Sequence, residues 1–515
     1  MSTVTNPILP GCYPDPSICR VGEDYYLVTS TFEYLPGLPV LHSRDLVTWE
    51  TIGHVVHRPG QLDYTGIASS GGLYAPTIRH HDGLFWVICT LVGQPQGNPG
   101  GNFLMTATDP AGPWSDPMWL DADGIDPSIF FDDDGRIWVH GTRLAREPEW
   151  FHQTEVWIRE LDPETKKLTG PEHVVWSGAV KGAVWAEAPH LYKVDGTYYL
   201  MAAEAGTEFH HAESIAQAEV VTGPYTGTRG NPILTHRHLG RQHPVVGAGH
   251  ADLVEAADGS WWAVLLAMRT YGGYHYPLGR ETFLVPVVWE DGWPVFAPGV
   301  GKVPDEVEVP FATGPARGSA QGLASGVVAP DDLRWTAVRA LPAEVATPAG
   351  QGWDLPLRAA TLDSLEVPAF LGVRLQHTHA DFLARVTVDL AVGEEVGVVV
   401  RQSEKDHARL AVTRGGTGLV ARAVHRQRDE DREVGSAPVA DGPLTLAVRA
   451  RGVDLELLVA SGDAEPVVVG TVPATDLDTV ATGGFLGLWL GVYATSDGAE
   501  TSTVAHVEVT YTPAS

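Results

Sequence analysis

Long hydrophobic runs are absent from this 515-residue sequence. The longest apolar stretches, such as Trp261–Met268, are far shorter than the ~20 residues that a membrane-spanning helix needs. The first residues, MSTVTNPILPGCYPDPSI, contain neither a basic cluster nor an apolar core, so we expect no secretory signal there. These absences predict a cytoplasmic protein without a membrane partner.

Cysteine and positive charge are also scarce. The three cysteines, Cys12, Cys19 and Cys89, form no CxxC pair, which argues against a disulfide framework and against a zinc site. Lys and Arg number 34 against 64 Asp and Glu, so the net charge is -30. A field of that sign repels phosphate backbones. We therefore expect no nucleic-acid partner. The net charge does not argue against binding of a neutral ligand.

Turn residues and tryptophan are abundant instead: there are 57 Gly, 38 Pro and 16 Trp, and only 19% of residues are charged. One pattern recurs about every 50–65 residues, in the period range of repeat folds. Each copy is a short strand, a tight turn and an aromatic strand, and a blade of a β-propeller begins in this way. The five copies start with YPDPSI, YAPTI, GIDPSI, AEAPHL and GHADLV. We therefore predict a five-bladed propeller.

The pattern stops near residue 305, and a Gly- and Ala-rich segment follows. Beyond it, apolar and polar residues alternate in short runs such as Leu383–Leu390 and Leu444–Ala450, which is typical of a β-sandwich. We predict an all-β protein with a catalytic propeller over 1–305, a linker over 306–326 and a sandwich over 327–515. We expect the sandwich to help close the pocket of the propeller.

The repeat alignment also predicts which distant residues meet. The inner strands of a propeller line one channel, so side chains at their starts converge. Three carboxyl groups, Asp15, Asp126 and Glu187, occupy these starts. Asp15 and Asp126 each precede a proline, where an Asx turn is the alternative explanation. Three clustered carboxyls suit cleavage of a glycosidic bond, which needs an acid and a second group that activates water or attacks the sugar.

Sugar rings also need flat apolar contacts, for which Phe32, Tyr74 and Trp185 are candidates, with packing between blades as the alternative. A non-catalytic sugar-binding propeller is a competing function, but it does not require all three carboxyls.

The segments NPILPGCYPDPSI, GLYAPTIR, GIDPSIFFDDDGRIW, AEAPHLYKVDGTYYLM, GAGHADLVE and GGYHYPLGRETFLVPV together resemble glycoside hydrolase family 43, in its β-xylosidase and α-L-arabinofuranosidase branch. FLGVRLQHTHADFLARVTV and GLWLGVYATSDG resemble the C-terminal sandwich of that branch. The resemblance implies an inverting, exo-acting hydrolase that releases terminal β-1,4-xylosyl or α-L-arabinofuranosyl units from xylo-oligosaccharides or arabinoxylan fragments. An arabinan-cleaving or arabinoxylan-debranching enzyme is the alternative.

The resemblance also implies roles for single residues. Asp15 matches the general base, Asp126 the residue that tunes and orients the acid, and Glu187 the general acid. Arg280 matches an arginine that binds sugar hydroxyls, with an ion pair to Glu281 as the alternative. His250 matches a histidine in the channel that contacts water or, in some members, calcium.

No cofactor is expected to be required, although a structural calcium near His250 stays open. Relatives often form dimers or tetramers, so a homo-oligomer also stays open.

Two differences from the family pattern fall at positions that decide specificity. Tyr74 stands where a tryptophan often stacks on substrate, and GLWLGVYATSDG differs from the sandwich loop that contributes an aromatic to the pocket. The preference between xylose and arabinose therefore stays open.

Overall fold

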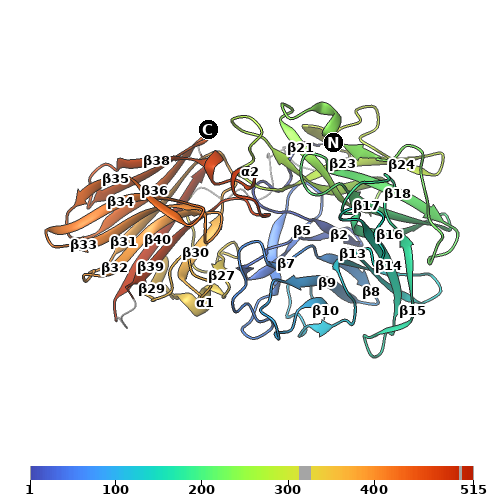
Figure 1. Cartoon of the computed structure of the whole chain (residues 1–515), viewed down its shortest axis with the longest axis horizontal. Helices are drawn as coiled ribbons and strands as arrows, with labels where there is room; N and C mark the ends of the chain where they lie inside the picture. The colour runs from blue at the N-terminus through green and yellow to red at the C-terminus, as the bar shows by residue number, and fades with distance from the viewer. Residues whose placement is uncertain (1, 312–325, 498–501, 514–515) are drawn as a thin grey trace.

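The computed structural model describes residues 2–311, 326–497 and 502–513, which form two bodies of β-sheet side by side (Figure 1). The expectation of an all-β protein is confirmed, since strands dominate and the described helices are single turns. These helices are η1 (Arg237–Leu239), α1 (Pro342–Val345), η2 (Ala474–Asp476) and α2 (Thr479–Thr482). No helix in the described ranges is long and apolar enough to cross a membrane.

The N-terminal body contains five antiparallel sheets, one for each copy of the repeat. The first runs β2 (Ser17–Val21), β3 (Asp24–Val28), β5 (Gly37–Ser43), β6 (Glu50–Val56). The second runs β11 (Met118–Trp119), β10 (Gly101–Ala107), β9 (Leu84–Val92), β7 (Gly72–Leu73), and β8 (Thr77–His81) also pairs with β9. The third runs β12 (Ile125–Phe131), β13 (Ile137–Leu144), β14 (Thr154–Leu161), β15 (Leu168–Trp176).

The fourth sheet runs β16 (Glu187–Val194), β17 (Thr197–Glu204), β18 (Ala212–Ala218), β19 (Thr226–Gly227), and β20 (Leu234–Thr235) also pairs with β18. The fifth runs β21 (Val245–Glu255), β22 (Trp261–Arg269), β23 (Glu281–Glu290), β24 (Trp293–Phe296). The strands that begin the repeats form a closed series of contacts, in the order β2, β8, β12, β16, β21 and back to β2. Their starts therefore face a common centre.

Tight turns in the repeat set the register of these sheets. Asp82 and Gly83 link β8 to β9, and both have positive φ, 51° and 74°. Asp195 and Gly196 link β16 to β17 in the same way, with φ of 49° and 81°. Two consecutive residues with positive φ make the hairpin turn that Asp-Gly favours.

The N- and C-terminal parts of the first body meet where β1 (Ser2–Thr5) pairs with β25 (Glu306–Val309). The expected linker, 306–326, therefore begins too early, because Glu306–Val309 alternates exposed acids with buried valines and adds a strand. Residues 312–325 of that linker lie outside the described part of the chain.

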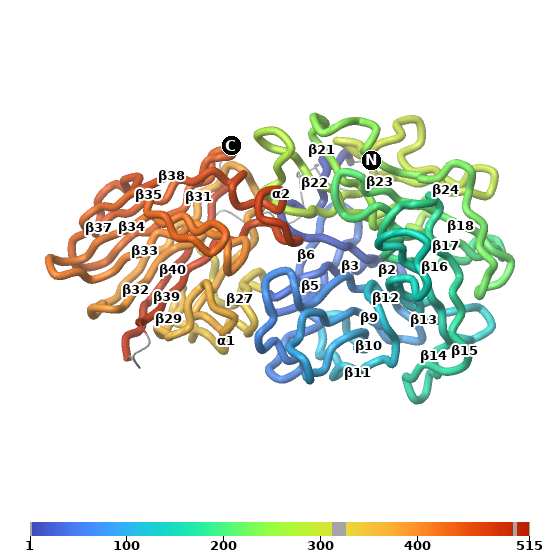
Figure 2. Tube along the Cα trace, viewed as in Figure 1, coloured from blue at the N-terminus to red at the C-terminus, as the bar shows by residue number. Residues whose placement is uncertain are grey.

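The C-terminal body is a sandwich of two antiparallel sheets (Figures 1 and 2). The larger runs β28 (Thr347–Ala349), β29 (Gly352–Pro356), β40 (Val504–Pro513), β31 (His379–Thr387), β36 (Leu444–Arg451), β37 (Asp454–Ser461), β38 (Val467–Pro473), and β26 (Gly326–Val327) also pairs with β40. The smaller runs β30 (Ala369–Arg374), β39 (Trp489–Ser496), β32 (Glu394–Arg401), β33 (His407–Gly415), β34 (Gly418–Gln427), β35 (Glu430–Val439).

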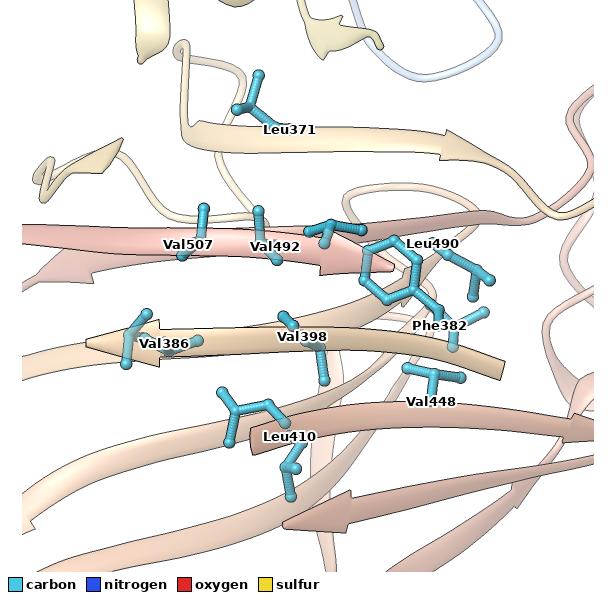
Figure 3. Close-up of a cluster of buried hydrophobic side chains, with 14 of the residues drawn as sticks. Leu371, Phe382, Val386, Val398, Leu410, Val448, Leu490, Val492 and Val507 are labelled. Carbon is cyan, nitrogen blue, oxygen red and sulfur yellow. The ribbon is translucent and has the colours of Figure 1, made fainter. Parts of the chain in front are cut away.

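Alternating burial along the strands builds the sandwich core. Every second residue of β31 points inward, so Phe382 and Val386 are buried while their neighbours are more exposed. Figure 3 shows these side chains facing Val398, Leu410 and Val492 of the smaller sheet. This period of two matches the pattern in the sequence.

The two bodies are joined through β4 (Tyr34–Leu35) of the first and β27 (Ala337–Val338), which pair with each other. The Tyr34 ring stacks on Trp489, with centroids 4.1 Å apart and an interplanar angle of 6°. Arg401 of the sandwich is fully buried and pairs with buried Glu33 at 3.0 Å, and it also donates to the Tyr34 hydroxyl at 2.8 Å. A charged pair with no access to water is stable only while both partners are present.

This pair generates a prediction about the domain junction. Arg401→Met leaves the Glu33 carboxylate buried without its cation, which is expected to cost about 3–5 kcal/mol of unfolding free energy. The double variant Arg401→Met/Glu33→Gln is expected to regain most of that loss, since it removes the uncompensated charge. Chemical unfolding of the full chain measures both. Arg422→Met, at a half-exposed pair with Glu433, is the matched control and should change little. Equal losses in the single and double variants would contradict the explanation.

Candidate active site

A pocket lies where the repeat-starting strands of the N-terminal body converge. It is lined by Asp15, Phe32, Tyr74, Ala75, Ile125, Asp126, Glu187, Thr207, His250, Arg280 and Phe485. Of the eight residues proposed from the sequence as catalytic or sugar-contacting, all but Trp185 are in this set. They come from sheets that are far apart in the chain, and Phe485 comes from the sandwich. The pocket is therefore built by both bodies.

The backbone is distorted where the carboxyl-bearing strands begin. Asp15, Asp126, Ala188 and His250 have φ between 51° and 55°, which is uncommon for residues other than glycine. The pairing register shifts at the same places, between Ile125 and Ser128 in β12 and between Glu187 and His190 in β16. Such bulges re-aim a side chain and persist at functional sites, where the surrounding structure holds the strain.

Asp15 is buried and held by donors from two directions. Arg280 Nη1 donates to its Oδ1 at 2.8 Å, and Ser30 Oγ donates to its Oδ2 at 2.5 Å. His250 Nδ1 lies 3.4 Å from Oδ1. A guanidinium and a hydroxyl donor both stabilise the ionised carboxylate. Ser30 was not identified from the sequence, because a lone serine inside a strand-rich segment gives no signal.

Asp126 and Glu187 have the opposite surroundings. Burial, followed by the negative charge of Asp15, raises the pKa of Asp126 to about 7 although its Oδ2 accepts a hydrogen bond from the Ala188 amide at 3.1 Å. Burial, followed by the charges of Asp126 and Asp15, raises the pKa of Glu187 well above its usual range. The pocket thus contains one carboxyl that is paired with a cation and two whose pKa values are raised.

Arg280 is the cation of the pocket. Besides Asp15, its Nη1 donates to Thr207 Oγ1 at 3.3 Å, and its guanidinium lies over the rings of Phe32 and Phe485 at 5.5 and 5.4 Å. The alternative ion pair with Glu281 does not form. Glu281 instead pairs with Arg269 at 2.7 Å.

Three aromatic rings pack against one another in the wall of the pocket. Phe32 stacks on Phe485 with centroids 5.9 Å apart, and Tyr74 meets both rings edge to face. Although GLWLGVYATSDG differs from the loop that contributes an aromatic in the family, the sandwich still supplies one, Phe485, just before that segment. Gly484 permits this approach: a Cβ there would lie 2.5 Å from Ser70 Oγ, and its φ is 79°.

Trp185 lies outside this pocket. It lines a hollow of about 470 Å³ that shares Tyr74, Ile125, Glu187, Thr207 and Phe485 with the pocket. The two spaces therefore adjoin, and Glu187 lines both of them.

The centre below the pocket does not fit calcium. Arg79 of the second sheet places its guanidinium there, 2.8 Å from Asp252 of the fifth sheet and 3.2 Å from His190 of the fourth. Ser17 and Ser128, from the first and third sheets, complete this buried cluster. Calcium requires six to eight oxygen ligands, and a fixed guanidinium repels it. Among the described residues no group of three or more His, Cys, Asp or Glu is arranged to hold a metal ion.

Comparison with known proteins agrees with this division of the chain. Residues 4–294 match the family described as "Glycosyl hydrolases family 43", and residues 332–511 match "Beta xylosidase C-terminal Concanavalin A-like domain". The chain is 39% identical over 516 residues to "Xylosidase/arabinosidase" of Butyrivibrio fibrisolvens, covering 97% of each protein.

Two further similarities extend over nearly the whole chain. It is 37% identical to "Non-reducing end alpha-L-arabinofuranosidase BoGH43B" of Bacteroides ovatus, covering 96% of this chain and 92% of that protein. Its fold superposes on the crystal structure of xylan beta-1,4-xylosidase from Bacillus halodurans with a TM-score of 0.91, 31% identity and 99% coverage of both chains.

The electrostatics of the pocket predict a pH-dependent gain in stability for Asp126→Asn. The folded-state pKa of Asp126, about 7, lies above the ordinary ~3.9. Below about pH 4 the carboxyl is protonated in both the folded and the unfolded state, so it does not lower the free energy of unfolding. Between about pH 4 and pH 7 the unfolded state ionises more readily, so the free energy of unfolding falls as the pH rises, and above about pH 7 this loss is constant. Thermal unfolding should show the variant more stable than wild type by on the order of 4 kcal/mol at pH 8 and nearly equal to it at pH 4. Asp133→Asn, at an exposed carboxylate, is the control; a gain that is independent of pH would contradict the explanation.

Proposed function

The chain belongs to glycosyl hydrolase family 43, and from this premise we propose that it is an inverting, exo-acting enzyme that releases terminal β-1,4-xylosyl and α-L-arabinofuranosyl residues from xylo-oligosaccharides or arabinoxylan fragments. The observation that carries the proposal is the single pocket that holds Asp15, Asp126 and Glu187 together with Arg280. Relatives that span the whole chain are named for both sugars.

We propose that the five sheets are the blades of a five-bladed propeller and that this propeller, extended to Val309 by β25, is the catalytic domain. The closed series of contacts among the repeat-starting strands supports this proposal. It also explains why carboxyls from the first, third and fourth repeats meet. The sandwich then acts as the second wall of the pocket.

Asp15 is the proposed general base. An inverting glycosidase needs one carboxylate that takes a proton from water as the water attacks the anomeric carbon. Arg280 and Ser30 each donate a hydrogen bond to Asp15 and thereby fix both of its oxygens. The guanidinium of Arg280 packs against the aromatic wall and its Nη2 donates to the Phe485 carbonyl oxygen at 3.5 Å, and we propose that its other N–H groups bind sugar hydroxyls.

Glu187 is the proposed general acid, which protonates the leaving oxygen. That role requires a carboxyl that keeps its proton near neutral pH, and burial together with two neighbouring carboxyls supplies this property. Asp126 is the proposed tuning residue: its charge raises the pKa of Glu187, and its bond to the Ala188 amide fixes the backbone next to the acid.

Exo action follows from how the pocket is closed. Phe485 enters from the sandwich, where its amide donates to Ser70 Oγ at 2.9 Å, and packs on Phe32. Only a chain end fits against such a wall, with the rest of the substrate in the hollow beside Glu187. The proposed reaction uses two carboxyls and water and requires no cofactor. We also propose a cytoplasmic location, in which the substrates are short oligosaccharides.

A substrate panel tests the function. Aryl β-xyloside, aryl α-L-arabinofuranoside, xylobiose, arabinan oligosaccharides and branched arabinoxylan oligosaccharides separate the proposed activity from an arabinan-cleaving or debranching one. Glu187→Gln is expected to lower kcat on xylobiose by about 10²–10⁴, since it removes general-acid catalysis, and to lower it less on aryl glycosides, whose leaving groups need less protonation. Turnover by Glu187→Gln at the wild-type rate would contradict the assignment of Glu187 as the general acid and would favour a sugar-binding protein without catalytic activity.

The pH–rate profile tests the tuning role of Asp126. Its basic limb reports the acid, so Asp126→Asn, which removes a negative charge beside Glu187, should move that limb to lower pH. The limb should not move in Asp133→Asn. An unmoved basic limb in Asp126→Asn would show that Asp126 does not raise the pKa of the acid.

A further inference from the structure

The hollow beside the pocket carries a feature that hydrolysis of a neutral sugar does not require. It adjoins the pocket and shares Glu187 with it, so under the proposed function it receives the leaving part of the substrate. Its walls include the rings of Trp185 and Phe209, as expected for a sugar-binding space. They also include Arg241.

Arg241 is held by aromatic rings rather than by an acid. Its guanidinium lies 5.0 Å from the centre of the Phe209 ring and 4.9 Å from that of Tyr274. These two rings are themselves edge to face, 6.0 Å apart. Within the described residues no hydrogen bond or ion pair to Arg241 is formed, although acidic residues outnumber basic ones almost two to one in this chain. Arg241 is exposed, so the rings position the cation at the surface while its N–H donors bond to no described residue.

The other charges around the hollow restrict where a ligand charge can lie. Glu208, His210 and Glu187 also line it, and the pKa of Glu187 is raised. Glu208 repels an anion, and Arg241 is the lining residue that always carries a positive charge, so it is the favoured partner of an anionic ligand group. A guanidinium presents parallel N–H donors that match the two oxygens of a carboxylate.

We propose that Arg241 binds a carboxylate carried by the leaving part of the substrate, so that the enzyme processes acidic as well as neutral oligosaccharides. This inference rests on the proposed function. Two sources supply the same chemistry: a uronic acid branch on the sugar next to the cleaved bond, and a reducing end oxidised to an aldonic acid.

The test compares substrates that carry the terminal pentose released in the panel above and differ only in the second unit. That unit is neutral xylose, its aldonic acid, or xylose bearing a uronic acid. The measured quantity is the ratio of kcat/KM for the acidic substrate to kcat/KM for the neutral one. Arg241→Gln is expected to lower this ratio about tenfold for at least one acidic substrate, because a charge-assisted hydrogen bond is lost. Which substrate responds identifies the source of the carboxylate.

Three comparisons make the outcome decisive. Glu208→Gln should raise the same ratio, and the surface variant Arg229→Gln should leave it as in wild type. Added salt should lower the ratio in wild type more than in Arg241→Gln, since salt screens exposed charge pairs. An unchanged ratio in Arg241→Gln for both acidic substrates, with normal turnover of the aryl glycosides by wild type, overturns this inference and leaves the proposed function intact. No turnover of any pentoside by wild type overturns both.

Discussion

The mutual repulsion of carboxyl groups that are buried together is the interaction on which the rest of this structure depends. Asp15, Asp126 and Glu187 share one pocket with a single cation, Arg280. Arg280 pairs with Asp15, so the protein can hold one ionised carboxylate there at low cost, and further ionisation is opposed by burial and by charge. The consequence is a division between a carboxyl paired with a cation and carboxyls whose pKa values are raised. That division is what acid–base cleavage of a glycosidic bond requires.

A rigid frame must hold this unfavourable cluster in place. Below the pocket, Arg79 of the second sheet and Asp252 of the fifth form a buried ion pair, with polar partners from the first, third and fourth sheets. Beside it, Glu33 and Arg401 join the sandwich to the first body, and the adjacent Ser70 hydroxyl accepts the amide of Phe485. The strained backbone at Asp15 and Asp126 persists because these contacts leave it no alternative.

Much of this arrangement could be predicted from the sequence, because it repeats. The family resemblance and the strand-rich fold are confirmed, and the alignment of the repeats placed Asp15, Asp126 and Glu187 at equivalent strand starts, where the structure has them in one pocket. Site residues that lie outside the repeats could not be predicted in this way. Phe485 reaches the pocket from a different domain, and its only local signal is the Gly-Gly pair before it.

The remaining differences have similar causes. Four residues of the expected linker, Glu306–Val309, form a strand because β1, from the N-terminus, pairs with them. The local sequence does not indicate a partner about 300 residues away. Arg79 likewise looked like an ordinary strand residue, and only the closed arrangement of the sheets puts its guanidinium at the centre. Pairwise contacts between distant segments are what a single sequence reveals least.

The most direct measurement is the titration of the Glu187 carboxyl, followed by carbon-13 NMR in protein with labelled glutamate side chains and assigned by the signal lost in Glu187→Gln. The clustered carboxyls predict a midpoint well above the ordinary ~4.3, with Glu187 protonated at neutral pH. A midpoint near that ordinary value would contradict the account.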